Sequence, residues 1–251
     1  MKLIKQFTLL VTILLFAACA RNTEEIELKL NLNVGDSQTI IASTDTSQGT
    51  AVSLKDRTEV KFTVSEATEN SYTYNVDVIR IKSETKMMGE VDRYDSDKKL
   101  SRMTTSEIET HNEFKDYLES EFQISLDHRG KVTQPFSKMN GYKLEFPIVD
   151  MSNVQLVLPE SKVRVGSTWK GEKTNEFTDQ IIKTTYEIED ITSNEVEISF
   201  VSIIPAFSGL LGENKAYGDY RLNRQTGTLI KGTLKMDLQT GGSVTKTYEA
   251  K

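Results

Sequence analysis

The chain of 251 residues is long enough for one large domain or two small ones, with ample sequence for a buried core. Hydrophobic residues make up 37% and charged residues 27%, a balance typical of a globular chain and not of a disordered one. The 37 acidic side chains outnumber the 31 basic ones and give a net charge of −6, which excludes a protein that tracks nucleic-acid phosphates. We therefore expect no nucleic-acid partner.

The N-terminus has the pattern of a secretory signal peptide. Two lysines precede an apolar run over residues 7–16, which ends at the small residues Ala17 and Ala18. The run is too short to cross a bilayer as a helix of the mature protein, which takes about 20 apolar residues. We predict that residues 1–18 form a signal peptide that is removed.

Cys19 follows directly and is the only cysteine of the chain, so it has no partner for an internal disulfide. Phe16-Ala17-Ala18-Cys19 resembles the lipobox of bacterial lipoproteins, with Phe16 in place of the usual Leu. The resemblance implies acyl chains on Cys19, and two or more chains give durable attachment to a membrane. It also implies a place in the cell envelope, and Ala20 resembles the sorting pattern of the outer membrane. The periplasmic or surface face stays open, and an ordinary secretory leader is the alternative.

The rest of the chain is predicted to be a short tether, residues 19–25, followed by one β-rich domain, residues 26–251. Apolar and polar residues alternate over residues 60–64 and 72–78, the period of half-buried antiparallel strands. Runs of the same character occur at residues 28–32, 122–126, 196–200 and 234–238. The predicted fold class is mainly β, with an antiparallel curved sheet that forms a sandwich or a partly open barrel.

One segment, residues 98–121, has the spacing of an amphipathic helix. It contains no Gly or Pro, and apolar residues recur every three to five positions. Asp95 and Asp97 precede it as candidate caps, and we expect the helix to lie across the sheet. His111 falls near the apolar stripe, where packing is favoured over metal binding because no second histidine is close in sequence.

One interpretation divides the domain into two pseudo-repeated halves, residues 26–134 and 160–251. In each half a Val-Gly pair, at residues 34–35 and 165–166, leads through a turn into a strand. The helix accounts for most of the extra length of the first half. An internal duplication and a chance likeness of antiparallel strands both stay open.

Two further features recur in the halves. The alternation slips in phase within residues 72–81 and again within residues 196–203, which predicts a β-bulge in each strand. Asp127-His128-Arg129-Gly130 and the Asn-to-Gly segment 223–227 have the composition of hairpin turns.

The order of landmarks along the chain resembles one family. The lipobox is followed by Asp-Arg-Tyr-Asp-Ser at residues 92–96, by the hairpin of residues 122–132, and by Val-Arg-Val-Gly-Ser-Thr-Trp at residues 163–169. This order is similar to that of the bacterial lipoproteins grouped as domain of unknown function 6263, common in Bacteroidota. The resemblance implies an envelope location and a β-rich domain, and it implies no reaction.

The sequence contains no catalytic signature. The two histidines form no zinc motif, and a Gly-x-Ser-x-Gly elbow, a phosphate loop and a dinucleotide fingerprint are absent. Ser125 and His128 are close in sequence, but a strand end and its turn explain them better than catalysis does. We predict a protein without enzymatic activity and without a cofactor.

The densest acidic group is interpreted as a solvated turn and helix cap. It lacks the Gly and the distal Glu of a calcium loop, so we expect no metal site at Glu90, Asp92, Asp95 and Asp97. A hydrolase that uses acidic residues remains the weakest alternative, because nothing singles out a pair of carboxylates.

Binding is the favoured class of function, because curved sheets commonly enclose an apolar pocket. The loop of residues 205–212 is apolar and contains two glycines, so Phe207, Leu210 and Leu211 are candidates for a mobile lip that admits a ligand or meets a partner. A buried hairpin tip is the equal alternative. The predicted function is a lipid-anchored envelope protein that binds a hydrophobic small molecule or an envelope protein, with a structural module of an envelope complex as the alternative. The candidate lining residues are Tyr72, Tyr74, Met87, Met88, Phe200, Phe207, Leu210 and Leu211.

Overall fold

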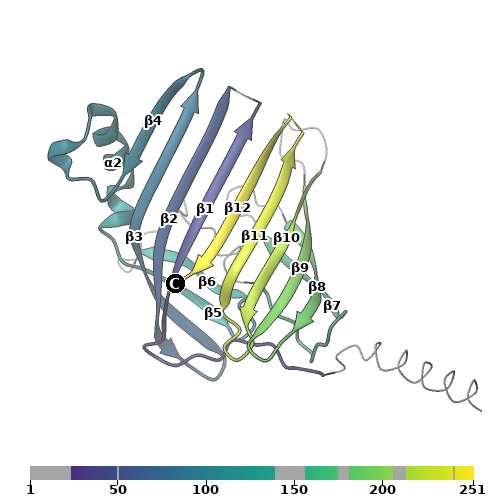
Figure 1. The fold of residues 1–251 in the computed structure, drawn as a ribbon. Helices are drawn as coiled ribbons and strands as arrows, with labels where there is room; N and C mark the ends of the chain where they lie inside the picture. Colours follow the sequence, from purple (N-terminus) through teal and green to yellow (C-terminus); the bar gives the residue numbers. More distant parts are fainter. Residues whose placement is uncertain (1–23, 50, 139–155, 175–180, 206–212, 240) are drawn as a thin grey trace, which may run out of the picture.

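The computed structural model describes residues 24–49, 51–138, 156–174, 181–205, 213–239 and 241–251. Within these ranges the chain folds as one antiparallel sheet of twelve strands with an α-helix beside it (Figure 1). The predicted signal peptide, Cys19 and the lip residues Phe207, Leu210 and Leu211 lie outside the described residues.

The sheet is curved and open. In chain order its strands are β1 (Ser37–Gln48), β2 (Val52–Ala67), β3 (Ser71–Met87), β4 (Glu90–Asp95), β5 (Phe122–Asp127), β6 (Val132–Lys138), β7 (Thr168–Thr174), β8 (Ile181–Ile191), β9 (Glu195–Ile204), β10 (Asn214–Asn223), β11 (Leu229–Leu238) and β12 (Gly242–Ala250). Their order across the sheet is β6-β5-β3-β2-β1-β12-β11-β10-β9-β8-β7, and β4 pairs with the C-terminal part of β3. In Figure 1, β5 and β6 pass behind the front strands, so the sheet curls around its rear face. The prediction of a mainly β fold with a curved antiparallel sheet is confirmed.

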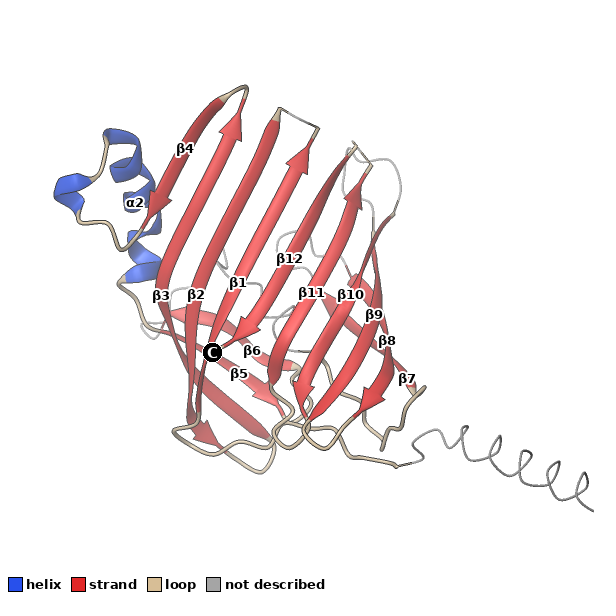
Figure 2. Ribbon diagram, viewed as in Figure 1, coloured by secondary structure: helices blue, strands red, loops and turns tan. Residues whose placement is uncertain are grey.

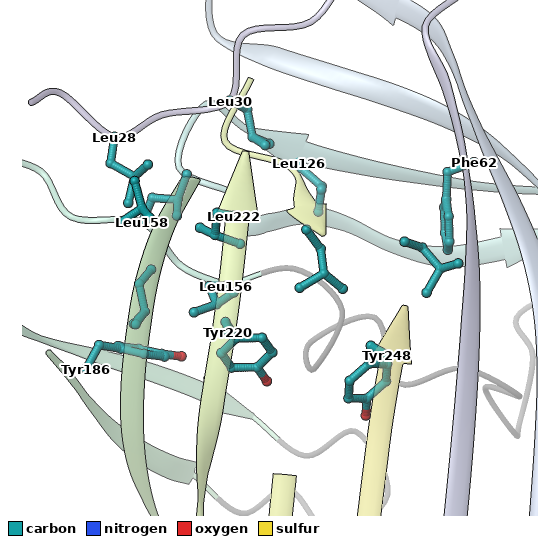
Figure 3. Packing of buried hydrophobic residues seen from close by; sticks show 14 of the residues in the cluster. Leu28, Leu30, Phe62, Leu126, Leu156, Leu158, Tyr186, Tyr220, Leu222 and Tyr248 are labelled. Atoms are coloured by element: carbon teal, nitrogen blue, oxygen red, sulfur yellow. The ribbon is translucent and has the colours of Figure 1, made fainter. Parts of the chain in front are cut away.

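One face of the sheet carries the core. Over residues 58–64 of β2 and 72–76 of β3 every second residue is buried, as at Phe62 and Tyr74, whereas the residues between them, such as Lys61, face the other way. Two extended segments complete the core, and they meet where Ile26 pairs with Val163. Figure 3 shows side chains of these segments among those of the strands; the most deeply buried are Leu28, Leu30, Leu156 and Leu158.

The two halves of the sheet have the same strand order. Strands β1, β2, β3, β5 and β6 form one meander, and β7 to β11 form a second meander that runs in the same direction across the sheet. Strand β12 joins the two, because it pairs with β1 on one side and with β11 on the other. Two tandem repeats would have this arrangement.

The turns that begin the two halves share their backbone hydrogen bonds. The Gly35 amide donates to the Val64 carbonyl, and the Gly166 amide donates to the Ile188 carbonyl, both at 2.8 Å. Both glycines have positive φ, 93° and 81°, a conformation that residues with a Cβ rarely adopt. Val64 and Ile188 are therefore equivalent positions in the two halves.

The side chain after each glycine closes the turn. Asp36 Oδ2 accepts a hydrogen bond from the Asn33 amide at 2.7 Å, and Ser167 Oγ accepts one from the Arg164 amide at 3.0 Å. Asp36 and Ser167 thus have the same role in the two halves, because each side chain accepts a backbone amide hydrogen bond within its turn. Two residues further along, Gln38 in β1 corresponds to Trp169 in β7.

The predicted bulge in β3 is confirmed. The register between β2 and β3 shifts between the pairs Glu59–Arg80 and Val60–Val78, which leaves Ile79 as the extra residue. The bulge explains why the alternation of apolar residues slips at this point.

The predicted bulge in β9 is wrong. β9 keeps its register with β8 and β10 through Phe200 and Val201. Val201 lies on the outer face opposite Tyr217 and is 49% exposed. Ser202 is buried, where its hydroxyl lies 2.7 Å from that of Thr184. Because Val201 is exposed and Ser202 is buried, the alternation of apolar and polar residues shifts in the sequence although the strand has no bulge.

The predicted helix is shorter than expected. A 3₁₀ helix, η1 (Leu100–Arg102), comes first, and α2 (Thr105–Leu118) covers the middle of the predicted segment 98–121. Its cap is Thr104, whose hydroxyl accepts from the Glu107 amide while the Glu107 carboxylate accepts from the Thr104 amide. The prediction that Asp95 or Asp97 caps the helix is therefore wrong.

Asp95 and Asp97 instead bind Arg80. The Arg80 guanidinium lies 2.7 Å from Asp95 Oδ2 and 2.9 Å from Asp97 Oδ2. Hydrogen bonds from Arg80 are the main cause that lowers the pKa of Asp95 to about 2.

The helix packs at the side of the sheet and does not lie across it. Figure 2 shows α2 next to the end of β4, and it contacts β3 and β4. The Tyr94 ring packs on Phe114 with centroids 5.7 Å apart, and the Tyr94 hydroxyl lies 2.9 Å from His111 Nδ1. His111 is a half-buried packing residue, in agreement with the prediction.

Candidate functional site: a pocket between the two halves

The predicted pocket residues do not come together as one group. Tyr72, Tyr74 and Phe200 are buried in the core. Met87 and Met88 are 53% and 88% exposed at the tip of the β3–β4 hairpin, so the prediction that they line a pocket is wrong. The reason is that burial along β3 ends at Ile81, and the last two residues of the strand are exposed.

A pocket of about 380 Å³ lies where the first half meets the turn between β10 and β11. Among the predicted lining residues that the structure describes, Tyr74 is the one in this pocket. The volume falls in the range of small-molecule sites, roughly 300–1,000 Å³. Its apolar side comes from the N-terminal segment and from β1, β2, β5 and β11; the residues are Leu32, Ile40, Phe62, Val64, Leu126 and Leu229.

Gln38 explains why space remains here. Gln38 is the cross-strand neighbour of Phe62, and its counterpart Trp169 is the cross-strand neighbour of Tyr186. The Trp169 and Tyr186 rings stack with centroids 5.0 Å apart. Phe62 and Tyr186 lie on opposite sides of the core (Figure 3). The second half therefore places an indole where the first half has a much smaller amide.

The two counterparts are anchored in the same way. Gln38 Nε2 donates to the Leu229 carbonyl at 2.7 Å, and Trp169 Nε1 donates to the Val157 carbonyl at 2.8 Å. Gln38 thus ties β1 to the start of β11, and Trp169 ties β7 to the extended segment that contains Val157. The halves differ in the volume of this side chain and not in its hydrogen bond.

Polar groups form the other side of the pocket. Burial raises the pKa of the Tyr74 hydroxyl, and the nearby Tyr72 and Asp36 side chains are lesser causes of this increase. The Tyr74 hydroxyl therefore stays protonated at neutral pH. The polar residues of the lining are Asp36, Ser37, Gln38, Asn223, Thr226, Thr228 and Lys251.

A larger hollow, of about 880 Å³, lies over β1 to β4 and β12. Alternation places most of its side chains on the face opposite the core. Four of its charged side chains form two pairs: Arg93 lies 2.7 Å from Glu84, and Lys82 lies 3.2 Å from Asp95. Because the lining of this hollow is mostly polar and charged, we place the candidate site in the smaller, more apolar pocket.

Two carboxylates of this hollow have pKa values that move in opposite directions. Burial raises the pKa of Asp56, whereas Arg80 lowers that of Asp95. Asp56 pairs with Ser83 and Ser83 with Tyr94, so these three side chains share one face. Asp95, the next residue after Tyr94, lies on the other face. The two carboxylates cannot share a proton as a catalytic pair does.

Ser125 and His128 have separate partners. Ser125 Oγ lies 3.1 Å from Thr73 Oγ1, and His128 Nε2 contacts the Glu69 carbonyl. Asp127 accepts the amides of residues 129 and 131 and closes the hairpin turn, as predicted. In the described ranges, no three His, Cys, Asp or Glu side chains gather as a metal site.

Among the helices that the structure describes, none is both long and apolar enough to cross a bilayer. No protein-family model and no curated protein matches the chain.

Two solved structures are distantly similar. The first, described as lipid–protein interactions in lipovitellin, is 12% identical with a TM-score of 0.49, over 86% of this chain and 25% of the lipovitellin chain. The second, a hypothetical protein from Chlamydia trachomatis, is 11% identical with a TM-score of 0.28, over 86% of each chain. This chain thus spans about a quarter of the lipovitellin chain. Likenesses of this size carry no argument about function.

The sequence analysis missed Gln38, Asp36 and Leu229 as site residues. A usable signal was present, because aligning the two Val-Gly turns sets Gln38 against Trp169. Leu229 gives no such signal, since only the folded sheet brings β11 next to β1 through β12.

Proposed function

We propose that the chain is a lipid-anchored protein of the cell envelope, held at the outer membrane by acyl chains on Cys19, and that its β domain binds a small apolar molecule without catalysing a reaction. Membership of the bacterial lipoprotein family that its landmarks resemble is part of this proposal. The pocket at Gln38 supports the binding role, because the equivalent position is occupied by Trp169 in the other half. A purely structural sheet gives no reason for this difference.

The volume of the pocket limits the size of the ligand and, with it, the expected affinity. At about 30 Å³ for each water-sized group, 380 Å³ holds on the order of a dozen non-hydrogen atoms. With about 0.5 kcal/mol per atom, the binding free energy is about 6 kcal/mol, and the Kd is on the order of tens of micromolar. Decan-1-ol matches this size and serves as the probe.

Replacing Gln38 tests the proposal. In the full chain carrying Cys19→Ser, decan-1-ol is titrated by calorimetry against the parent and against Gln38→Trp. The indole occupies the pocket as Trp169 does in the second half, so binding is expected to weaken at least tenfold. Gln48→Trp, at the exposed end of the same strand, is the matched control and should bind like the parent. Unchanged binding by a folded Gln38→Trp variant would refute the proposed site.

Anchoring has a separate test. Cells that express the wild type or Cys19→Ala are given a labelled fatty acid, and the purified chains are compared. The wild type should carry the label and Cys19→Ala should not. Equal labelling of the two chains contradicts the lipid anchor and leaves the pocket experiment unaffected.

A second candidate function is contact with another envelope protein, and the exposed tip of the β3–β4 hairpin favours it. Met87, Met88 and Val91 are 53%, 88% and 42% exposed there. A photo-crosslinking residue at position 88 should capture one defined neighbour, whereas the same group at the exposed position 219 should not. Recovery of the uncrosslinked monomer from both positions would count against this function.

A further inference from the structure

We propose that the pocket at Gln38 selects an amphiphile with an uncharged, hydrogen-bonding head group and disfavours an anionic one. This inference rests on the proposed binding function and names the ligand class that the same site takes. It follows from the charges and the hydrogen bonds of the lining.

The ammonium group of Lys251, a lining residue of the pocket, is paired with a carboxylate outside the pocket. Lys251 lines the pocket, but its ammonium binds Glu59 Oε2 at 2.9 Å, and Glu59 lies in β2 on the face opposite the core. Asp36 is the other charged residue of the described lining, and it is exposed. A carboxylate or phosphate head would therefore meet the Asp36 carboxylate without a free cation to offset the repulsion.

Gln38 and Asn223 offer one hydrogen-bond acceptor and one donor to a ligand. Gln38 Nε2 is used by the Leu229 carbonyl, and the described residues give Gln38 Oε1 no hydrogen bond. Asn223 Oδ1 accepts the amides of Gln225 and Thr226, and the described residues give Asn223 Nδ2 no hydrogen bond. A hydroxyl or amide head group, which both donates and accepts, matches this pair.

The apolar side fits the rest of such a molecule. Phe62 and Val64 are 5% and 2% exposed and lie beside Leu126 at 1%. A saturated chain of about ten carbons would bury its CH₂ groups against these side chains, and each buried CH₂ group strengthens binding. The tail supplies affinity, and the head group decides between ligands of equal length.

Three probes of equal chain length test the selection. The full chain carrying Cys19→Ser is titrated by calorimetry at pH 8 with decan-1-ol, with decanoate, which is anionic, and with decylamine, which is cationic. Decan-1-ol should bind at least tenfold more tightly than decanoate, and decylamine, whose charge the Asp36 carboxylate attracts, should also bind more tightly than decanoate. Binding of decanoate as tight as that of either other probe overturns the inference and leaves the binding function standing. Binding of none of the three overturns the proposed function and, with it, this inference.

Asp36→Ser tests the source of the selection. Ser167 closes the equivalent turn with a hydroxyl, so Asp36→Ser keeps the hydrogen bond to the Asn33 amide and removes the charge. Affinity for decanoate should rise threefold to tenfold, about the effect of one partly solvated charge, while affinity for decan-1-ol changes less than twofold. Asp219→Ser, on the outer face of β10, is the control and should change neither. A ratio of affinities unchanged by Asp36→Ser overturns the role of this carboxylate.

Discussion

Replacing Gly232 with alanine is expected to destabilise the protein because the Tyr220 ring lies over this residue. Gly232 in β11 is the cross-strand neighbour of Tyr220 in β10. A Cβ at position 232 would lie 2.6 Å from Tyr220 Cδ1 and 2.7 Å from Cε1, whereas ordinary contacts begin near 3.4 Å. The Tyr220 ring is 4% exposed and stacks on Phe200 with centroids 4.9 Å apart, so it has little room to move.

The expected cost of Gly232→Ala follows from two opposing effects. Overpacking of a closed core costs about 1–3 kcal/mol. Removing a glycine from the unfolded chain gains about 0.4–1 kcal/mol. The free energy of unfolding should therefore fall by about 1–2 kcal/mol, and Tm should fall by roughly 2–8 °C for a domain of this size.

A double-mutant cycle separates these effects. Urea unfolding is followed for the parent, Gly232→Ala, Tyr220→Ala and the double variant. In the Tyr220→Ala background no ring opposes the new methyl group, so Gly232→Ala should be neutral or slightly stabilising. The same loss in both backgrounds, or a Gly232→Ala variant as stable as the parent, would show that the contact with Tyr220 is not the cause.

Three further predictions concern other parts of the sheet. Thr104→Ala removes the N-cap of α2 and should cost about 0.5–2 kcal/mol locally; faster amide exchange within α2 at nearly unchanged Tm is the expected signature, and unchanged exchange contradicts it. Arg80 lowers the pKa of Asp95 to about 2, below its unfolded value of about 3.9, so the stability from this pair is present above about pH 4 and is lost as pH falls toward 2. Asp95→Asn should reduce the loss of unfolding free energy between pH 5 and pH 2.5, measured by urea unfolding, by less than about 1 kcal/mol because the side chain is one-third exposed. Trp169→Gln should lose about 2–4 kcal/mol and open a second pocket; calorimetry would then count two decan-1-ol molecules per chain, and a count of one in a folded variant contradicts the equivalence of the halves.

The strands could be predicted because one face of the sheet is apolar. Where a strand is half buried, burial follows the sequence period, and even the bulge at Ile79 is visible as a slip of that period. The same rule fails at Ser202, because a hydroxyl pair with Thr184 makes a polar residue acceptable inside the core. Burial there depends on a partner 18 residues away, which the local pattern does not contain.

The helix cap and the pocket were missed for different reasons. The capping box of Thr104 and Glu107 is legible in the sequence, but Asp95 and Asp97 compete for the same role until the structure shows Arg80 between them. The pocket depends on contact between β1 and the start of β11, which no local pattern indicates.

The pairing of β1 with β12 also has a consequence for folding during synthesis. Ile40 pairs with Ala250 across these two strands, so this edge of β1 stays unpaired until β12 has been synthesised. Until then the unpaired amides and carbonyls of β1 can pair with other chains. A chaperone that shields this edge would protect the nascent protein, and a variant without β12 would expose the edges of two half-sheets and be prone to aggregate.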